Sequence, residues 1–157
     1  MFPPHGLVEV TEVGERELAG CKLAVVGFRA LVDGTRLLVP TARLKTSGLR
    51  PVATGREVAA VYAVLRGSAS GRRPPGYKWH QILWLRLNTG SLANAAEVVR
   101  DLVHLKAQRP LSATERRILD VAQDQLLLEL SVVTRQSRAS LERHLLRLCR
   151  TGLKKGA

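Results

Sequence analysis

Basic and aromatic side chains gather in residues 71–84, and their chemistry suits an anionic partner. Arg72 and Arg73 precede two prolines, and the helix-like run that follows holds both tryptophans of the chain, with Trp79 standing between a lysine and a histidine. Arginine and lysine bind phosphates, and an aromatic ring can wedge between bases. We therefore expect this stretch to contact nucleic acid through Arg72, Arg73, Lys78 and Trp79.

The two tryptophans are expected to play different roles. They lie five positions apart, which corresponds to a rotation of about 140° on a helix, so the two rings cannot share a face. Trp84 shares a stripe with His80 and Leu87, which favours a structural place in the core. Trp79 stands beside Lys78 and is expected to face DNA. The alternative is an ordinary aromatic side chain that packs, partly buried, against the other domain.

The charge of the whole chain also indicates an anionic partner. Its 157 residues include 25 Lys and Arg but only 13 Asp and Glu, for a net charge of +12. Such an excess is self-repulsive unless something anionic binds, most often nucleic acid and next an acidic membrane surface. No apolar run approaches the roughly 20 residues that span a bilayer, and the amino terminus lacks the pattern of a secretory signal. The sequence therefore predicts a cytoplasmic protein with no membrane partner.

Catalytic and metal-binding patterns are not found in the sequence. The four histidines have no metal-ligand spacing among themselves or with cysteine. There are no paired acids, no Gly-rich phosphate loop and no nucleophile elbow. Cys21 and Cys149 are far apart and are expected to be small buried side chains in a reducing compartment. We predict that the protein is not an enzyme and needs no metal or cofactor.

Periodicity predicts an α+β fold with two domains. Residues 7–53 alternate as short antiparallel strands, with a hairpin at Asp33-Gly34 and a last short strand at 49–53, which predicts a small β-barrel. A capping box at Thr54 and Glu57 begins a short helix that closes this domain at Arg66. Residues 67–76 are expected to be a linker. An all-α helical bundle is expected over 77–150, followed by a basic tail at 151–157.

Several motifs occur in the order and spacing of one known family. The early Phe-Pro-Pro-His-Gly at residues 2–6 is similar to its Tyr-Pro-x-His-Gly, and Leu-Val-Pro at 38–40 precedes Ser-Gly-Leu-Arg at 47–50 as in its second motif. The most specific match is Ala-Glu-Val-Val-Arg-Asp-Leu at 96–102, followed by Leu-Ser-Ala at 111–113 and Glu-Arg-Arg-Ile-Leu at 115–119. Over nearly its whole length the chain resembles the CarD/CdnL family of bacterial RNA polymerase-binding transcription regulators.

The resemblance implies a Tudor-like amino-terminal domain that binds the RNA polymerase β subunit. It also implies a helical domain that meets promoter DNA at the upstream edge of the melted bubble, where a tryptophan wedge in the minor groove stabilises the open complex. We expect a monomer whose DNA binding is largely independent of sequence. The residues expected at these sites are Arg16, Arg36 and Arg50 for the polymerase, and Trp79, Arg72, Arg73, Lys78 and Arg116 for DNA.

The chain departs from the family pattern in three places. The family has an earlier strand, roughly Phe-x-x-Gly-Asp-x-Val-Val, so either the barrel is open here or the start of the sequence is misassigned. Arg16 falls on a polymerase-contacting arginine of the family, whereas a second such position is Leu38. Arg36 lies two residues back on the same strand face and is expected to substitute. Counted without gaps from Glu97, the family's wedge falls on Gly76, three residues before Trp79.

Other functions are compatible with the same sequence. One is a polymerase- or protein-binding adaptor that kept the β domain and lost the wedge. Another is a basic RNA- or ribosome-associated protein, which the charge fits although no RNA-binding signature is found. The arginines of the last helix either form a solvated face or add nonspecific affinity for DNA or an acidic surface. These arginines are Arg138, Arg143, Arg147 and Arg150.

Overall fold

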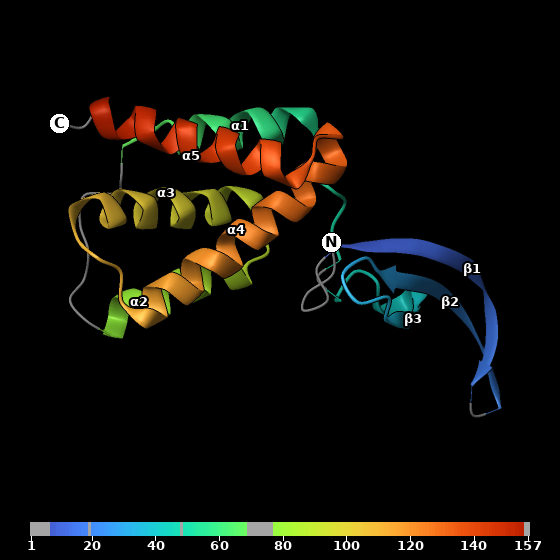
Figure 1. Cartoon of the computed structure of the whole chain (residues 1–157). Helices are drawn as coiled ribbons and strands as arrows, with labels where there is room; N and C mark the ends of the chain where they lie inside the picture. The colour runs from blue at the N-terminus through green and yellow to red at the C-terminus, as the bar shows by residue number, and fades with distance from the viewer. Residues whose placement is uncertain (1–6, 19, 48, 69–76, 156–157) are drawn as a thin grey trace. The chain divides into compact units, whose positions relative to one another are not determined.

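The computed structural model describes residues 7–18, 20–47, 49–68 and 77–155 (Figure 1). The chain divides into two compact units, Met1–Val52 and Ala53–Ala157. A three-stranded antiparallel sheet is followed by five helices, so the predicted α+β fold is confirmed. Within the described ranges, every helix is too short or too polar to cross a membrane.

The sheet of the first unit has the strand order β1-β2-β3, with β1 at Val8–Leu18, β2 at Cys21–Ala30 and β3 at Arg36–Pro40. The predicted hairpin at Asp33-Gly34 is confirmed, but its turn differs from the expected type. Only Gly34 has a positive φ, of 74°, whereas Asp33 accepts a hydrogen bond from the Thr35 amide through its carboxylate at 3.0 Å. A short 3₁₀ helix, η1 at Thr41–Arg43, follows β3.

The sheet is open in the part of the chain that the structure describes, with β1 and β3 at its edges. Its small core consists of Val26, Phe28 and Val39. The partly buried Val8 of β1 and Leu37 of β3 pack against it, as do Leu44 and Leu49. The strand expected at residues 49–53 is irregular chain instead. Pro51 lies in the middle of this stretch and has no amide hydrogen for a strand ladder, which explains the difference.

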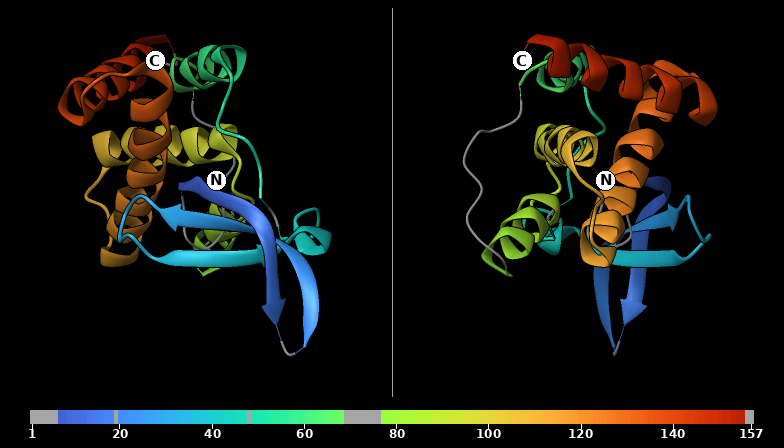
Figure 2. Two further views of the ribbon diagram at one scale, coloured as in Figure 1. Left: turned by 90° about the vertical axis from the view of Figure 1, so that its right-hand side faces the viewer. Right: turned by 60° about the vertical axis from the view of Figure 1, so that its left-hand side comes forward.

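The second unit contains α1 (Gly55–Leu65), α2 (Tyr77–Asn88), α3 (Leu92–Gln108), α4 (Ala113–Thr134) and α5 (Arg138–Lys155). Both predicted capping boxes are present, at Thr54 with Glu57 and at Ser112 with Glu115. The views in Figures 1 and 2 agree that α1 and α5 lie side by side on one side of α3, with α2 on the other side and α4 crossing between them. The helix α5 continues through residues 151–155, which were expected to be a tail.

The domain boundary differs from the predicted one, because α1 packs with the helical unit. Its buried Val58, Val61 and Leu65 belong to the same apolar core as α2 to α5. Just before α1, the amide of Ala53 donates a hydrogen bond of 2.9 Å to the buried carboxylate of Glu129 on α4. The boundary therefore lies between residues 52 and 53. Residues 69–76 of the predicted linker lie outside the described residues.

A close backbone approach holds the end of α5 against the end of α1. A Cβ atom placed on Gly152 would lie 2.5 Å from the carbonyl oxygen of Gly67 and 2.9 Å from that of Arg66. Both distances are shorter than van der Waals contact, so only glycine allows the two helices to come this close at their ends.

Replacement of Gly152 by alanine should therefore loosen α5 from α1. We expect Gly152→Ala to lower the free energy of unfolding by about 1 to 3 kcal/mol, because the new methyl group must displace backbone. The measurement is urea denaturation followed by circular dichroism. Gly55→Ala is the matched control, since a Cβ at this helical glycine meets nothing within 4 Å. Equal stability of Gly152→Ala and the wild type would show that the close approach is not required.

Candidate functional site

Trp79 is a core residue, which contradicts the expectation that it faces outward. Its side chain is 6% exposed and belongs to the main apolar core of the helical unit. Trp79, Leu83 and Leu87 follow one another at four-residue spacing, and this stripe is the one that α2 buries. Trp84 is half-buried at the flank of the same face rather than at its centre.

The indole nitrogen of Trp79 is buried without a hydrogen-bond partner among the described residues. A buried donor left unsatisfied costs about 1 to 3 kcal/mol, so the ring is held by its apolar contacts. The outward face of α2 instead carries Lys78, Gln81 and Leu85, all of them exposed. A helix that buries its first tryptophan can still offer DNA a cation from its first turn.

Ionic contacts fix α2 on α3. Arg86 of α2 lies 3.3 Å from a carboxylate oxygen of Glu97 and 3.6 Å from one of Asp101. Asp101 is buried and also accepts hydrogen bonds from the neighbouring Arg100, at 2.8 and 3.0 Å. Sequence reasoning used this Ala-Glu-Val-Val-Arg-Asp-Leu segment only as a family signature. Its charged residues also set the position of the helix that carries Lys78.

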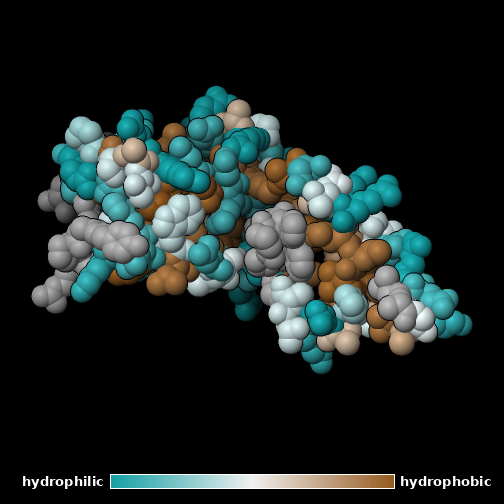
Figure 3. Space-filling view, turned by 90° about the horizontal axis from the view of Figure 1, so that it is seen from below, coloured by the Kyte–Doolittle hydropathy of each residue, from teal (hydrophilic) through white to brown (hydrophobic). Residues whose placement is uncertain are grey.

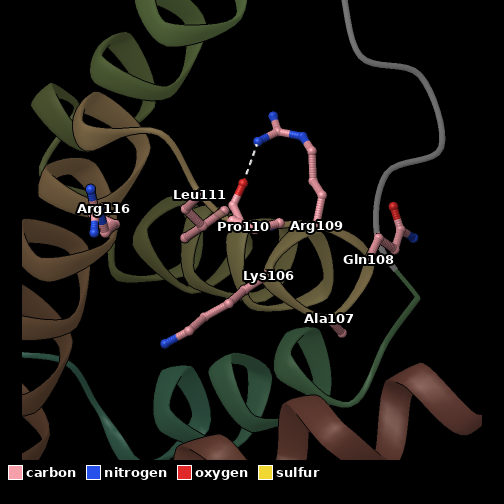
Figure 4. A pocket seen from close by; sticks show the side chains of 7 residues that line it. All are labelled: Lys106, Ala107, Gln108, Arg109, Pro110, Leu111 and Arg116. Carbon is pink, nitrogen blue, oxygen red and sulfur yellow. Dashed lines mark hydrogen bonds between the residues drawn. The ribbon is translucent and has the colours of Figure 1, made fainter.

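The turn between α3 and α4 forms an open hollow of about 600 Å³ with a basic lining (Figure 4). Three cations contribute to it: Lys106 from the end of α3, Arg109 from the turn and Arg116 from the first turn of α4. Ala107, Gln108, Pro110 and Leu111 form the rest of the lining. Arg116, predicted from sequence as a DNA contact, thus lies among further cations that sequence reasoning did not single out.

The three cations of the hollow are not equally available to a ligand. Arg109 donates to the carboxylate of Glu115 at 2.7 and 3.0 Å and to the Pro110 carbonyl at 2.8 Å, the bond drawn in Figure 4. Its charge is therefore matched by a buried acid. Lys106 and Arg116 are exposed and form no ion pair within the described residues. They are the free positive charges of the hollow.

Glu115 should make the stability of this turn depend on pH. The hydrogen bond from Arg109 and those from Ser112 lower its pKa from 4.5 to about 2, against the effect of burial. Because the folded-state pKa is the lower one, the stabilisation is complete above pH 4.5 and is lost as the pH falls toward 2. We expect Glu115→Gln to cost about 1 to 3 kcal/mol at pH 7 and progressively less as the pH falls through about 2.

Urea denaturation across this pH range measures the difference between wild type and Glu115→Gln. Glu142→Gln on the exposed side of α5 is the control, and its stability should stay parallel to that of the wild type. A constant gap between Glu115→Gln and wild type down to pH 2 would contradict the assignment.

One face of the sheet carries the two arginines predicted to meet the polymerase. In the ladder Arg16 lies opposite Leu23, and Arg36 lies opposite Arg29. Opposed residues point to the same side of an antiparallel sheet, and so do alternate residues along β2. We call this surface the arginine face. It consists of Arg16, Leu23, Arg29, Arg36 and Leu38.

The arginine face is exposed at its arginines and leucines and is partly apolar, whereas Val25 and Gly27, which lie between them on β2, are buried. Leu38 is 52% exposed and Leu23 is 39% exposed. Figure 3 shows that apolar side chains also gather on the surface of the sheet unit as seen from below. Arg16 pairs with Glu12 at 3.1 Å and Arg29 with Glu9 at 2.8 Å, whereas Arg36 has no ion pair among the described residues. Exposed ion pairs are weak, so a partner with acidic groups can replace them.

The remaining predicted residues are placed as follows. Arg50 is half-buried and donates to the Pro51 carbonyl at 3.1 Å, outside the strands. Arg72 and Arg73 lie outside the described residues. Cys149 is buried, and burial raises the pKa of its thiol to about 11. Cys21 is exposed at the β1–β2 turn, so the expectation that both thiols are buried was wrong for this one.

Comparison with known proteins identifies the family. Residues 60–146, more than half of the chain, match the family described as CarD, C-terminal domain. The chain belongs to the CarD family. A protein of Bacillus subtilis (strain 168) named Putative transcription factor YdeB is 28% identical over 133 residues, which are 85% of this chain and 87% of that protein. The predicted resemblance is thereby confirmed, and with it membership of a transcription factor family that is not enzymatic.

Proposed function

We propose that this CarD-family protein regulates transcription initiation as a two-part adaptor. The sheet binds the RNA polymerase β subunit through the arginine face. The helical unit holds promoter DNA at the upstream edge of the bubble and lengthens the life of the open complex. The observation that carries the proposal is that Arg16 and Arg36 share one exposed face, with Leu38 beside them, in a chain of this family.

In this proposal cations hold the DNA, and no tryptophan wedge is used. Lys78, Lys106 and Arg116 are exposed and have no ion-pair partner among the described residues. Inserting Trp79 between bases would first require its removal from the core, at a cost on the order of a large-to-small core substitution, about 3 to 5 kcal/mol. The burial of Trp79 therefore favours the alternative in which the family's wedge has been lost.

Such binding is largely independent of DNA sequence, because contacts to phosphates carry no information about the bases. The polymerase provides the location instead. Once the sheet is bound to the β subunit, the helical unit is held near upstream DNA at a high effective concentration, so a weak contact becomes effective.

Reversing the charge of the arginine face should weaken binding to the polymerase. In Arg16→Glu combined with Arg36→Glu, Glu12 loses its partner and the face becomes acidic. We expect at least a tenfold loss of affinity for immobilised RNA polymerase, measured by biolayer interferometry. Arg43→Glu combined with Lys45→Glu makes the same change of charge elsewhere in this unit and should bind like wild type. Equal affinity of the two double variants would refute the polymerase contact.

Neutralising the hollow should shorten the life of the open complex. For Lys106→Gln combined with Arg116→Gln we expect a half-life at least threefold shorter than with wild type. The measurement is the decay of open complexes after addition of a competitor on a promoter that the protein activates. Trp79→Phe keeps an aromatic ring in the core and should leave the half-life nearly unchanged. The opposite pattern, with Trp79→Phe inactive and the double variant active, would restore the wedge mechanism.

A further inference from the structure

The helix α5 has an apolar and a basic side that lie opposite each other. Its buried side chains are Leu141, Leu145, Leu148 and Cys149. Arg143, Arg147 and Arg150 are exposed, and at 100° per residue they fall within about 60° of one another, on the side facing away from the buried stripe. These three residues, which we call the arginine ridge, extend over about 10 Å of the helix at 1.5 Å per residue.

The charge of the ridge is not neutralised by neighbours. The sequence of α5 holds six Lys and Arg residues but a single acid, Glu142. Arg143 donates only to the backbone carbonyl of Ala139, at 3.3 Å, and Arg147 and Arg150 have no ion pair among the described residues. Arg138 lies outside the ridge and differs in this respect, since it is paired with Asp124. Three adjacent exposed cations without counter-charge repel one another weakly, and an anion bound across them would remove that repulsion.

The surroundings of the ridge select among anionic partners. A membrane-bound amphipathic helix inserts its apolar side into the bilayer, but the apolar side of α5 is already buried in the core. Protein interfaces are built around large apolar anchors, and among its described residues the exposed side of α5 offers only the half-buried Leu146 beside the ridge. Proteins that bind single strands stack bases on aromatic rings, and α5 contains no Phe, Tyr or Trp. Of the anionic partners compared, a nucleic-acid duplex contacted at its phosphate backbone fits the ridge best.

We propose that the arginine ridge is a second DNA-binding surface, which contacts the phosphate backbone of a duplex without regard to sequence. The helix that carries it, α5, lies on the side of the helical unit away from α2 and the start of α4 (Figures 1 and 2), the two elements that carry Lys78 and Arg116. One straight duplex cannot lie along both surfaces. The ridge therefore binds a segment of DNA other than the one held by the hollow, and the helical unit bridges the two segments or follows a bend between them.

Duplex binding in the absence of polymerase tests the ridge directly. The full-length protein is titrated into a fluorescently labelled 16-base-pair duplex of arbitrary sequence, and anisotropy is recorded at several salt concentrations. The substitutions Arg143→Gln, Arg147→Gln and Arg150→Gln are made together in the Lys106→Gln, Arg116→Gln background, so that the hollow cannot bind the duplex in place of the ridge. There we expect at least a tenfold loss of affinity near 0.1 M salt. The slope of log K against log salt should fall by about 2.7, since each released phosphate contact contributes about 0.9.

The control distinguishes binding at a defined site from a general effect of the protein's net charge. In the same background, Lys22→Gln, Arg43→Gln and Lys45→Gln together remove three exposed cations from the sheet unit and lower the net charge by three, as the ridge substitutions do. This control should lose less than twofold. Arginine and glutamine have similar helix propensities, and equal melting temperatures of the variants confirm that the fold is kept. Equal losses by the two triple variants, or none by the ridge variant, would overturn the proposal.

Binding to other anionic ligands, and the variant of the hollow, test the proposal further. The ridge is not a duplex site if its triple variant loses affinity for single-stranded RNA or phosphatidylserine vesicles while duplex affinity is unchanged. Conversely, in the ridge triple variant, Lys106→Gln with Arg116→Gln should lower the remaining duplex affinity, because each surface binds a duplex of its own. If only the ridge substitutions leave duplex affinity unchanged, the proposed function still stands. If only the substitutions in the hollow do so, the proposal for the ridge still stands. A labelled and a biotinylated duplex captured together on streptavidin beads by wild type, but not by the ridge variant, would demonstrate bridging.

Discussion

The packing of α3 against all four other helices is the constraint on which the helical unit depends. Ten of its seventeen residues are buried, including the charged Arg100 and Asp101 and the polar His104. His104 forms a 3.0 Å hydrogen bond with the Cys149 carbonyl of α5, and Asp101 pairs with Arg86 of α2. Because α3 contacts α2 on one side and α1 with α5 on the other, it decides which face of each helix is left for a ligand.

The features set by local chemistry could be read from the sequence, and those set by tertiary contacts could not. The capping boxes at Thr54 and Ser112 need only a hydroxyl and a glutamate three residues later, so both were predicted correctly. The place of α1 depends on which apolar surface its stripe meets, and this is a property of α3 and α5. The same holds for α2, where two adjacent stripes, one through Trp79 and one through Trp84, were both compatible with a buried face.

The candidate sites likewise include features that the local sequence predicts and features that only tertiary contacts create. The shared face of Arg16 and Arg36 could be anticipated, because strand alternation and a hairpin fix it, and only the ladder register was needed to complete it. The hollow could not be anticipated from the sequence, because it forms only where the end of α3 and the start of α4 come together. Arg116 was predicted there, but no sequence pattern separated Lys106 from other surface lysines. Nor did any pattern reveal that Arg109 is held by the buried acid Glu115.

The positions of the acidic residues decide which cations of this chain, with its net charge of +12, are neutralised and which are left for a partner. The buried Glu115 pairs with Arg109, and the buried Asp101 pairs with Arg86 and Arg100. These three arginines therefore stabilise the fold. The exposed acids Glu9 and Glu12 pair with cations of the sheet. Among the cations left over are Arg36 of the arginine face, Lys106 and Arg116 of the hollow, and the three arginines of the ridge, whereas others such as Lys22, Arg43 and Lys45 lie elsewhere. A polymer of phosphates can meet the hollow and the ridge, whereas the apolar Leu38 within the arginine face suits a protein partner. In the proposed function the charge therefore separates the partners by surface. Because Trp79 is buried, that proposal relies on electrostatic attraction to hold DNA to the helical unit.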